Sequence, residues 1–477
     1  MKIKEKIKID LIVSGTGMTI IRGDPGGFIE SISTDTRTLS VGDFFIPVEG
    51  DNFDGHDFIE DAVKAGAGGF VYSRKQKGKI LEILGKVDNK KNFPGLVLEV
   101  ENTLVFYQEL ARNSMLRFDP VVIGITGSVG KTTARDFIVS ILSQDFDVVH
   151  TPKNHNTEIG VAAAMLNIGK NTDYFIVELG MRGKKQIGPL ADICNVSIGA
   201  ITAIGNSHLE FFADLEEIAM AKAEIASIIY KNRGKLFLNA DDSMTPYIKD
   251  NIRADIIEYG RNNGLYYNFI DADSDEWGRF SFDFFKNDHK KARIRLNLPG
   301  YHNIYNSCLA ASICDYLGVS PEKIKKGIES AVIEKYRMEI IDSGDSTLII
   351  DCYNASPLSM RKAIDTLCLI GEKNKRRKVA ILGDMLELGD RSRELHYEIG
   401  KYLLEKDIDV LIALGKLAKN IYKGFKDNRT DPDKMQCYYF PEREGFRSSL
   451  KNLVKPRDIV LIKGSRANKM EEIISYI

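Results

Sequence analysis

The stretch VVIGITGSVGKTTARDF, residues 121–137, decides the fold class that this sequence predicts. Apolar residues as far as Thr126 predict a buried strand, and from Lys131 onward the apolar residues recur at helical spacing. In a glycine-rich turn between a strand and a helix, the backbone N–H groups are able to point inward. Together with the positive N-terminal end of the helix, they form a site where phosphate groups bind. We therefore expect residues 127–133 to hold the phosphates of a nucleotide.

The residue types of this loop suit a triphosphate, although their spacing is unusual. Ile125, rather than a glycine, stands five places before Gly130, so the common G-x-x-x-x-G-K-[ST] pattern is not met. Lys131 supplies a mobile positive charge for the terminal phosphates, and the Thr132 hydroxyl is able to ligate Mg²⁺. An ordinary strand-to-helix turn is the alternative. The expected ATP contacts are Gly127, Ser128, Val129, Gly130, Lys131, Thr132 and Thr133.

Composition and charge describe a globular protein of about three domains. The 477 residues are 43% hydrophobic and 28% charged, and 66 Lys and Arg against 67 Asp and Glu give a net charge of −1. A sequence-independent nucleic-acid binder would carry a basic excess, so we expect no nucleic-acid partner. The sequence has no run of 18 apolar residues, so we expect no membrane insertion. An N-terminal segment without an apolar signal core, and six cysteines without a C-x-x-C pair, predict a cytoplasmic protein with reduced thiols.

Strands and helices alternate along most of the chain, which predicts an α/β fold with three domains. Residues 1–112 are expected to form a small N-terminal α/β domain, and residues 113–334 a central P-loop domain with a mainly parallel sheet. Within the central domain, the polar stretch at about 261–295 favours antiparallel strands. Residues 335–477 are expected to form a C-terminal Rossmann-like domain.

The loop spelling T-G-x-x-G-K-T-T resembles that of the Mur ligase family, whose members make amide bonds in building the peptidoglycan precursor. The resemblance extends over nearly the whole chain. The other matching segments are ISTDTRTLSVGDFFIPVEGDNFDGHDFI (32–59), TPKNHNTEIGVAAAMLNI (151–168), ELGMRGKKQI (178–187), ITAIGNSHLEFF (201–212), AMAKAEI (219–225), HNIYNSCLAA (302–311), DCYNASPLSM (351–360), ILGDMLELG (381–389) and VLIKGSR (460–466). DCYNASP and GDMLELG most resemble the member that adds D-alanyl-D-alanine to UDP-N-acetylmuramoyl-tripeptide, so these two compounds are the implied substrates.

The resemblance implies an ATP-dependent ligase. In this family the γ-phosphoryl group of ATP is transferred to the substrate carboxylate. The amine then attacks the acyl phosphate, and ADP and phosphate are released. Such a site holds a triphosphate beside a carboxylate, which requires concentrated positive charge and, by resemblance, two Mg²⁺ ions. The implied roles are binding of the UDP-substrate by the N-terminal domain, of ATP by the central domain and of the dipeptide by the C-terminal domain.

Three residues beyond the loop are candidates for metal binding and catalysis. Glu178 follows an apolar strand, so it either shares Mg²⁺ with Thr132 or is a solvated strand-end carboxylate. His208 alone suggests a general base or a structural histidine, and the resemblance implies a ligand of the second ion. Lys222 alone suggests a surface lysine. The resemblance implies a carbamate formed there with CO₂, which requires a neutral, partly buried amine. The expected catalytic residues are Lys131, His208 and Lys222, and the expected metal ligands are Thr132, Glu178, His208 and Lys222.

The resemblance also implies the remaining contacts. Asn303 and Asn306 approach the adenine, and Asn303 is also a candidate helix N-cap. Arg337 reaches ATP from the C-terminal domain, and Asp351 lies on the ribose or hinge side. The implied substrate contacts are Ser33, Thr34, Asp35, Thr36 and Arg37 for the uridine diphosphate, Asn156, Thr157 and Arg182 for the muramoyl-peptide, Tyr353, Asn354 and Ser356 for the dipeptide, and Lys463, Ser465 and Arg466 in a strand-end loop that closes over the ligands.

Two positions depart from the family pattern. The family often reads N-N-E-I-G and Y-N-A-N-P where this chain has Thr157 and Ser356, and a hydroxyl reaches different partners than an amide does. Both positions are implied substrate contacts, so a paralogous ligase that joins a different carboxylate and amine is one alternative. A P-loop NTPase without ligase activity is another, but it would leave His208 and Lys222 without a role. We expect a monomer.

Overall fold

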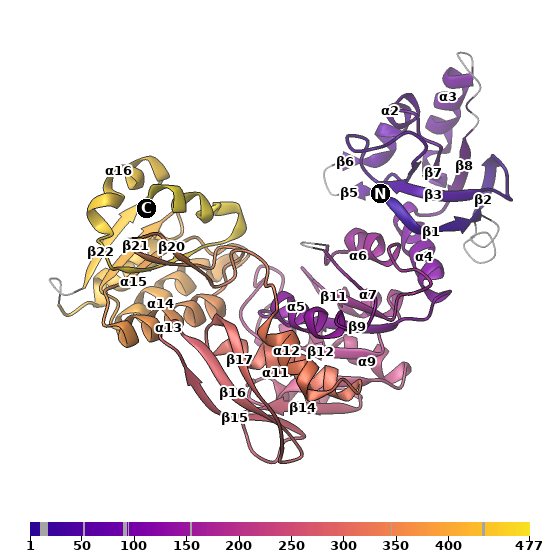
Figure 1. Cartoon of the computed structure of the whole chain (residues 1–477). Coiled ribbons are helices and arrows are strands. Elements are labelled where there is room, and N and C mark those ends of the chain that lie inside the picture. The colour runs from indigo at the N-terminus through magenta and orange to yellow at the C-terminus, as the bar shows by residue number, and fades with distance from the viewer. Residues whose placement is uncertain are drawn as a thin grey trace. The chain divides into compact units, whose positions relative to one another are not determined.

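This computed structural model describes residues 1–9, 18–50, 53–88, 93, 95–152, 155–344, 346–431 and 435–477 (Figure 1). The chain divides into two compact units. The first contains residues 1–123, 146–179 and 189–196, and the second contains residues 124–145, 180–188 and 197–477. Strands and helices alternate in both units, as the sequence predicts.

The first unit contains a six-stranded sheet in the order β1-β3-β4-β7-β8-β2. Its strands are β1 (Lys2–Lys8), β2 (Thr19–Arg22), β3 (Phe28–Ser33), β4 (Phe44–Phe45), β7 (Gly69–Ser73) and β8 (Leu96–Val100). The inner pairs β3–β4, β4–β7 and β7–β8 are parallel, whereas β1 and β2 pair antiparallel with their neighbours. Phe45, Phe70 and Tyr72 pack with apolar residues of α2 (Ile59–Lys64) and α3 (Lys77–Asp88) in one core. The loop that follows β3 therefore lies at the carboxyl edge of parallel strands, where ligands commonly bind.

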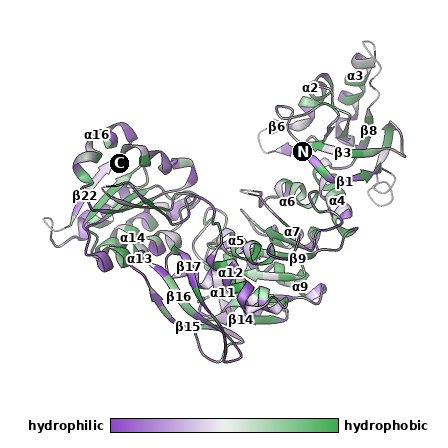
Figure 2. Ribbon diagram, in the orientation of Figure 1, coloured by the Kyte–Doolittle hydropathy of each residue, from purple (hydrophilic) through white to green (hydrophobic). Residues whose placement is uncertain are grey.

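A nine-stranded sheet follows in the order β10-β11-β9-β12-β13-β14-β15-β16-β17. Its strands are β9 (Val121–Thr126), β10 (Val148–His150), β11 (Tyr174–Glu178), β12 (Ile198–Ile201), β13 (Lys235–Asn239), β14 (Ile256–Gly260), β15 (Tyr267–Ser274), β16 (Arg279–Lys286) and β17 (His289–Pro299). Strands β12 to β15 are parallel, and β15, β16 and β17 are antiparallel. The predicted parallel sheet and its antiparallel stretch are thus confirmed. In Figure 2 the colours of β17 alternate between hydrophilic and hydrophobic, as expected for a strand with one solvated face.

Helix α5 (Lys131–Leu142), which begins at the glycine-rich loop, is held by two later helices. It packs against α11 (His302–Tyr316) and α12 (Pro321–Glu329). The approach to α12 is close, because a Cβ placed on Gly327 would lie 2.6 Å from the Cα of Ile141. The Ser140 hydroxyl donates to the Gly327 carbonyl at 2.7 Å. The C-terminal end of α5 is therefore held closely against α12.

The C-terminal part of the second unit is a six-stranded sheet in the order β18-β19-β23-β20-β21-β22. Its strands are β18 (Glu339–Asp342), β19 (Thr347–Ile350), β20 (Lys378–Gly383), β21 (Val410–Leu414), β22 (Gln436–Phe440) and β23 (Ile459–Lys463). All neighbouring pairs are parallel except β18–β19. Helices α13 (Pro357–Asn374), α14 (Ser392–Glu405), α15 (Lys419–Asn428) and α16 (Arg443–Leu453) connect them. This is the Rossmann-like arrangement that the alternating sequence predicts.

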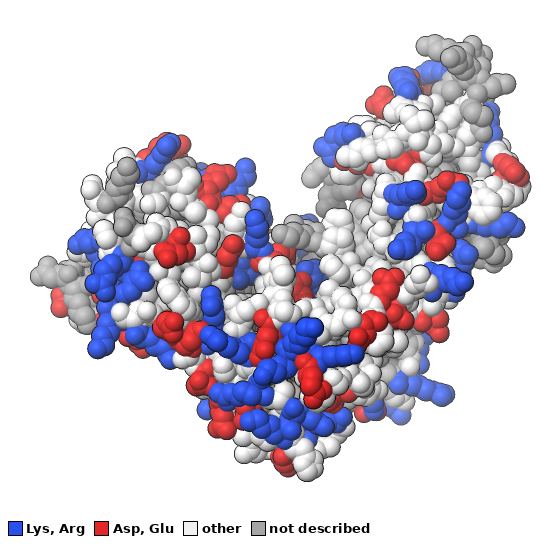
Figure 3. All heavy atoms as spheres, viewed as in Figure 1, with Lys and Arg blue, Asp and Glu red and all other residues white. Residues whose placement is uncertain are grey.

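The surface charges and the state of the cysteines agree with what the composition predicts. Figure 3 shows Lys and Arg interspersed with Asp and Glu on the viewed face, which agrees with the net charge of −1. All six cysteines are free thiols. Among the described residues, no helix has both the length and the apolar character that spanning a bilayer requires.

Candidate active site

The loop between β9 and α5 requires its two glycines. Gly127 has φ +144°, and a Cβ there would lie 2.0 Å from the Thr202 hydroxyl oxygen. Gly130 has φ +97°, and a Cβ there would lie 2.4 Å from Oδ1 of Asn306. Residues other than glycine rarely adopt such φ values, and at both positions an added Cβ would also collide with the neighbouring side chain. The predicted strand, loop and helix are therefore present, and Asn306 lies against the loop.

The loop is fastened to the segment that follows β12. The Ser128 N–H donates to the Ala203 carbonyl at 2.7 Å, and the Ser128 hydroxyl donates to the Gly205 carbonyl at 2.9 Å. The Thr202 hydroxyl donates to the Val129 carbonyl at 2.6 Å. Because Ser128 and Val129 are fixed on that side, the glycines and the first turn of α5 form the side of the loop that can face a phosphate.

Lys131 brings positive charge to this loop, and a second lysine lies close enough for that charge to affect its pKa. The Lys131 ammonium donates to the Gly127 carbonyl at 2.6 Å. Lys222 lies on α8 (Leu215–Ala223) and is 2% exposed, and among the described residues its Nζ has no recorded hydrogen bond or ion pair. Burial, with a smaller contribution from Lys131, holds the pKa of Lys222 well below its usual value. The surface-lysine alternative is therefore wrong, and the lowered pKa favours the neutral amine that reaction with CO₂ requires.

Thr132 and Glu178 each offer an oxygen of the kind that suits magnesium. Thr132 is buried in the first turn of α5, and its hydroxyl oxygen is a hard ligand of the type that Mg²⁺ prefers. Glu178 is a buried carboxylate at the end of β11, and its N–H donates to the Thr151 hydroxyl at 3.0 Å. A neutral Lys222 amine would join such a set only as a carbamate, which carries a negative charge on oxygen. The sharing of one ion by Thr132 and Glu178 stays a prediction.

Arg337 reaches the loop from the start of the C-terminal sheet. Its Nη2 donates to the Thr132 hydroxyl oxygen at 2.9 Å, and its Nε lies 3.5 Å from the Glu334 carboxylate. The guanidinium also stacks over the Tyr353 ring, with its central carbon 4.0 Å from the ring centroid. Arg337 and Tyr353, which were predicted as ATP and substrate contacts, are therefore brought together beside the phosphate loop.

The two asparagines of α11 bond to each other, but neither caps the helix. The Asn306 amide donates to Oδ1 of Asn303 at 3.1 Å, and the Asn303 amide donates to the Pro299 carbonyl at 2.7 Å. The helix begins at His302, and Tyr301 occupies the N-cap position without a side-chain bond. The N-cap expectation for Asn303 is therefore wrong, because its side chain turns back to the end of β17 instead.

Lys463 is an internal support of the C-terminal sheet. It is 1% exposed, and its ammonium donates to Oδ2 of Asp351 at 2.6 Å and to the Asn354 carbonyl at 2.9 Å. Because β19 and β23 are neighbouring parallel strands, their carboxyl ends lie side by side. This brings Lys463, at the end of β23, next to Asp351, which follows β19. Closure of Lys463 over the ligands stays a prediction. In this structure its ammonium group donates to Asp351 and Asn354 at the carboxyl end of the sheet.

Ser356, Ser465 and Arg466 also have structural partners. Ser356 caps α13 in a reciprocal pair with Ser359. The Ser465 hydroxyl accepts from the Leu386 N–H at 3.0 Å, and Arg466 pairs with Glu471 at 2.6 Å. Ser356 thus shapes the segment that begins α13, and Ser465 shapes the segment that follows β20. Both segments border the loops of the central sheet.

His208 faces a glutamate that the sequence interpretation did not single out. Its Nδ1 atom is buried and lies 2.7 Å from Oε2 of Glu387, in the segment that follows β20. The two residues have φ values of +56° and +61°. Glu387 occurs in GDMLELG, a motif noted in the sequence, but only the packing of the two segments reveals its neighbour. We regard this pair as part of the candidate site.

The residues predicted to hold the substrates lie in five separate segments of the chain. Ser33 ends β3, and its hydroxyl donates to the Asp35 carbonyl at 2.9 Å. Arg37 pairs with the Asp35 carboxylate at 2.6 Å, and this bonding lowers the pKa of Asp35 to about 2. Thr34 and Thr36 are half-buried in the same turn. Thr157 is the exposed N-cap of α6 (Glu158–Met165), preceded by the half-buried Asn156, and Arg182 is exposed. Of the matching segments, Asp51, Asn52, Lys153 and Asn154 lie outside the described residues.

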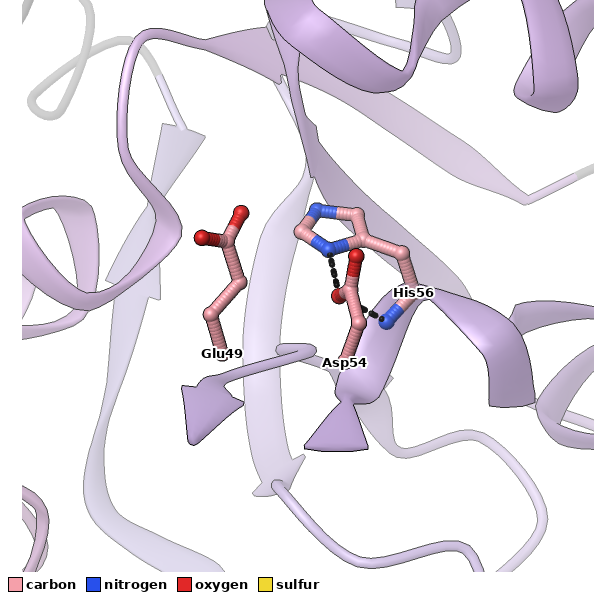
Figure 4. A group of neighbouring side chains, drawn as sticks. All are labelled: Glu49, Asp54 and His56. Carbon is pink, nitrogen blue, oxygen red and sulfur yellow. Dashed lines mark hydrogen bonds and ion pairs between the residues drawn. The ribbon is translucent and has the colours of Figure 1, made fainter. Parts of the chain in front are cut away.

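A second polar cluster in the first unit does not fit a metal ion. Glu49 and Asp54, in the strands β5 (Glu49–Gly50) and β6 (Phe53–Asp54), lie beside the buried His56 (Figure 4). The Ser73 N–H donates to Nε2 of His56 at 3.0 Å, so the ring proton is on Nδ1, which lies 2.6 Å from Asp54 Oδ1. Because both ring nitrogens are used, the imidazole has no lone pair for a metal.

Comparison with known proteins extends over nearly the whole chain. Three family models match: "Mur ligase family, catalytic domain" at residues 28–114, "Mur ligase middle domain" at 125–314 and "Mur ligase, glutamate ligase domain" at 336–466. The UDP-N-acetylmuramoyl-tripeptide–D-alanyl-D-alanine ligase of Bacillus subtilis is 32% identical over 449 residues, which are 94% of this chain and 92% of that protein. The Synechocystis ligase of the same name is 30% identical over 456 residues, with 94% and 92% covered.

Solved structures agree with the sequence relatives. MurF from Acinetobacter baumannii superposes with a TM-score of 0.88 at 27% identity, covering 100% of this chain and 99% of that chain. MurF from Thermotoga maritima in complex with ADP gives a TM-score of 0.77 at 25% identity, covering 94% and 97%. The predicted α/β fold with three domains is confirmed by this similarity, whereas the boundaries at residues 112 and 334 stay predictions.

Proposed function

Because this chain belongs to the Mur ligase family, we propose that it adds D-alanyl-D-alanine to UDP-N-acetylmuramoyl-tripeptide in an ATP-dependent ligation. The tripeptide carboxylate attacks the γ-phosphorus of ATP, which gives ADP and an acyl phosphate. The amine of the dipeptide then attacks the acyl carbon, the carbon–oxygen bond breaks, and phosphate leaves with that oxygen. This reaction places the enzyme in the cytoplasmic synthesis of the peptidoglycan precursor, where its substrates are made.

One observation carries the ligase proposal over a simple nucleotide switch. Lys222 is buried, its Nζ has no recorded partner among the described residues, and its pKa is lowered in part by Lys131 of the phosphate loop. Burying a lysine side chain is costly, which favours a functional use of Lys222 over a purely structural one. A switch needs only the loop and one carboxylate. A carbamate on Lys222 would instead place a second anion beside the loop, as a ligase with two cations requires.

The phosphate loop and its neighbours hold ATP in this proposal. Backbone N–H groups of residues 127–133 and the Lys131 ammonium bind the β- and γ-phosphates. Mg²⁺ held by Thr132, Glu178, His208 and carbamylated Lys222 would neutralise charge on the transferring phosphoryl group. Arg337 adds a planar cation at the Thr132 end of the loop, where it is able to bind a phosphate oxygen. Asn303 and Asn306 border the adenine, and Asp351 borders the ribose.

The substrate contacts follow the family pattern in this proposal. Ser33, Thr34, Asp35, Thr36 and Arg37 hold the uridine diphosphate, Asn156, Thr157 and Arg182 hold the muramoyl-peptide, and Tyr353, Asn354, Ser356, Lys463, Ser465 and Arg466 hold or shape the site of the dipeptide. Ser356 explains one departure from the pattern. It is the N-cap of α13, and serine and asparagine are equally good N-caps. An asparagine-to-serine exchange there preserves the helix start, which supports an unchanged amine substrate. We also propose a monomer.

The test is the dependence of phosphate release on both substrates. Purified protein is given ATP and UDP-N-acetylmuramoyl-tripeptide, with and without D-alanyl-D-alanine, and the nucleotide product is weighed. The proposal predicts sustained release only with both compounds, and a product heavier by the dipeptide less one water. D-alanyl-D-lactate and D-alanyl-D-serine serve as competing amines. Release from ATP alone would indicate the nucleotide switch, and ligation of another amine in preference would indicate the paralogous ligase.

A further inference from the structure

The contact between His208 and Glu387 joins two loops that are far apart in the sequence. His208 follows β12 in the central sheet, and Glu387 follows β20 in the C-terminal sheet. The loops are packed tightly around the pair, since a Cβ on Gly389 would lie 2.9 Å from the Cα of Glu210. A Cβ on Gly205 would lie 2.6 Å from Cδ2 of Leu358. The His208–Glu387 contact is therefore part of a docked surface and not a meeting of two free side chains.

The backbone of both residues supports a functional use of this contact. His208 and Glu387 each have a positive φ, at +56° and +61°. Such a conformation costs free energy for a residue with a side chain, and it persists at sites where the surroundings fix it for a purpose. The Nδ1 atom of His208 is buried and has no hydrogen bond of good geometry among the described residues, and Oε2 of the partly exposed Glu387 lies 2.7 Å from it as an ion-pair partner.

A histidine that ligates a metal almost always gives its other ring N–H to a carboxylate or a carbonyl. That partner selects the tautomer, because the nitrogen that keeps the proton cannot ligate a metal. Here Nδ1 faces the carboxylate, so a proton on Nδ1 leaves the lone pair on Nε2. The two groups thus have the arrangement of a carboxylate–histidine pair that is oriented for a cation.

We infer that Glu387 is a positioning residue that holds His208 with Nε2 directed to the divalent cation, so that docking of the loop after β20 completes the metal site. This inference rests on the proposed function, in which His208 is a metal ligand. The positioning role of Glu387 has a consequence that does not follow from the metal ligands alone. The affinity for the cation depends on the C-terminal sheet, because that sheet supplies the group that orients the ligand.

The test is Mn²⁺ binding to the full-length protein in the presence of a non-hydrolysable ATP analogue, followed by the electron paramagnetic resonance of free Mn²⁺. His208→Ala defines the contribution of the histidine. Glu387→Ala is expected to weaken the same binding step by about 10–100-fold, the usual effect of removing such a partner. Glu387→Gln keeps an oxygen that accepts from Nδ1–H and is expected to lose less. Glu394→Gln, an exposed glutamate paired with Arg391, is the matched control.

A second readout separates orientation from general damage. In protein labelled with ¹⁵N-histidine, the signal of His208 is identified by its loss in His208→Ala. Wild type and Glu387→Gln are expected to show the Nδ1–H form, and Glu387→Ala a mixture of both neutral forms. Thermal midpoints of all variants establish that they are folded.

Three outcomes are distinguishable. Weakened Mn²⁺ binding and a changed tautomer in Glu387→Ala support the inference. If His208→Ala weakens binding and Glu387→Ala behaves like Glu394→Gln, the positioning role is wrong while the metal role of His208 stands. If His208→Ala itself binds Mn²⁺ like wild type, the inference and the assignment of His208 to the metal are both overturned, and the ligation assay alone then decides the proposed function.

Discussion

Arg337 and Thr132 lie 205 residues apart in the sequence, yet Nη2 of Arg337 donates to the Thr132 hydroxyl oxygen at 2.9 Å. Thr132 is in the first turn of the helix that receives the phosphates, and Arg337 leads into the C-terminal sheet. The Tyr353 ring holds the guanidinium from the other side. The phosphate loop is thus contacted by a residue from outside the P-loop domain. A ligase needs such a contact, whereas an isolated P-loop does not.

Arg337→Lys should reduce kcat/KM for ATP by about 10–100-fold, because a charged hydrogen bond contributes about 1.5–3 kcal/mol. Lysine keeps the charge but lacks the planar guanidinium that stacks on Tyr353 and donates to Thr132 at the same time. Steady-state phosphate release measures the change. Arg391→Lys, in an exposed pair with Glu394, is the control. Equal kinetics for the two variants would contradict the proposed contact with ATP.

Gly130→Ala should abolish nucleotide binding and lower the thermal midpoint. The added Cβ meets Oδ1 of Asn306 at 2.4 Å, and φ is +97°. Gly85→Ala is the matched control, because Gly85 lies in α3 with nothing within 4 Å of an added Cβ. Alanine in a helix is favoured over glycine by about 0.5–1 kcal/mol, so the control should be neutral or slightly more stable. Binding of a fluorescent ATP analogue by Gly130→Ala at wild-type affinity would contradict the loop geometry.

Lys222→Met should lose activity and gain stability. The methionine side chain has a similar length and no unpaired polar group to bury. We expect kcat to fall by about 100-fold or more, as for other losses of transition-state charge stabilisation. The thermal midpoint of the metal-free protein at neutral pH should rise. Lys86→Met, at an exposed position of α3, should change neither. A fall in the midpoint would mean that Lys222 is held by a charged partner.

Stability should decrease as the pH falls from about 6.5 to about 4, in part because of His302. Burial lowers the pKa of His302 from 6.5 to about 4, so the folded state keeps the imidazole neutral while the unfolded state binds a proton. The stabilisation is therefore present above pH 6.5 and is lost as the pH falls toward 4. His302→Gln should reduce the drop in thermal midpoint between about pH 7 and pH 5. His289→Gln, at an exposed histidine, should leave it unchanged, and the opposite ranking would contradict the assignment.

The local parts of this site follow from the sequence. Gly127, Gly130 and Lys131 are neighbours in the chain, so strand, loop and helix signals suffice to predict them. The burial of Lys222 follows less directly. Helical phase places it at the edge of the apolar stripe of α8, and only the packing of that helix buries it fully.

Contacts between distant segments are where the sequence fails. Asn303 is a good N-cap type, but its amide finds the Pro299 carbonyl at the end of β17. Lys463 is predicted from the sequence in a strand-end loop that closes over the ligands, but it is buried because β23 lies beside β19 and Asp351. Glu387 lies in the motif GDMLELG, but nothing in the local sequence indicates its neighbour. Its meeting with His208 depends on the docking of two loops, which no periodicity encodes.

The measurement that most directly tests the central claim uses UDP-N-acetylmuramoyl-tripeptide labelled with ¹⁸O in its terminal carboxylate. ATP and D-alanyl-D-alanine are added, and the released phosphate and the nucleotide product are analysed by mass spectrometry. The account predicts one ¹⁸O atom in each phosphate released, because the carboxylate oxygen leaves with the phosphoryl group. Phosphate without label, whether or not the dipeptide is joined, would contradict the acyl phosphate and with it the proposed reaction.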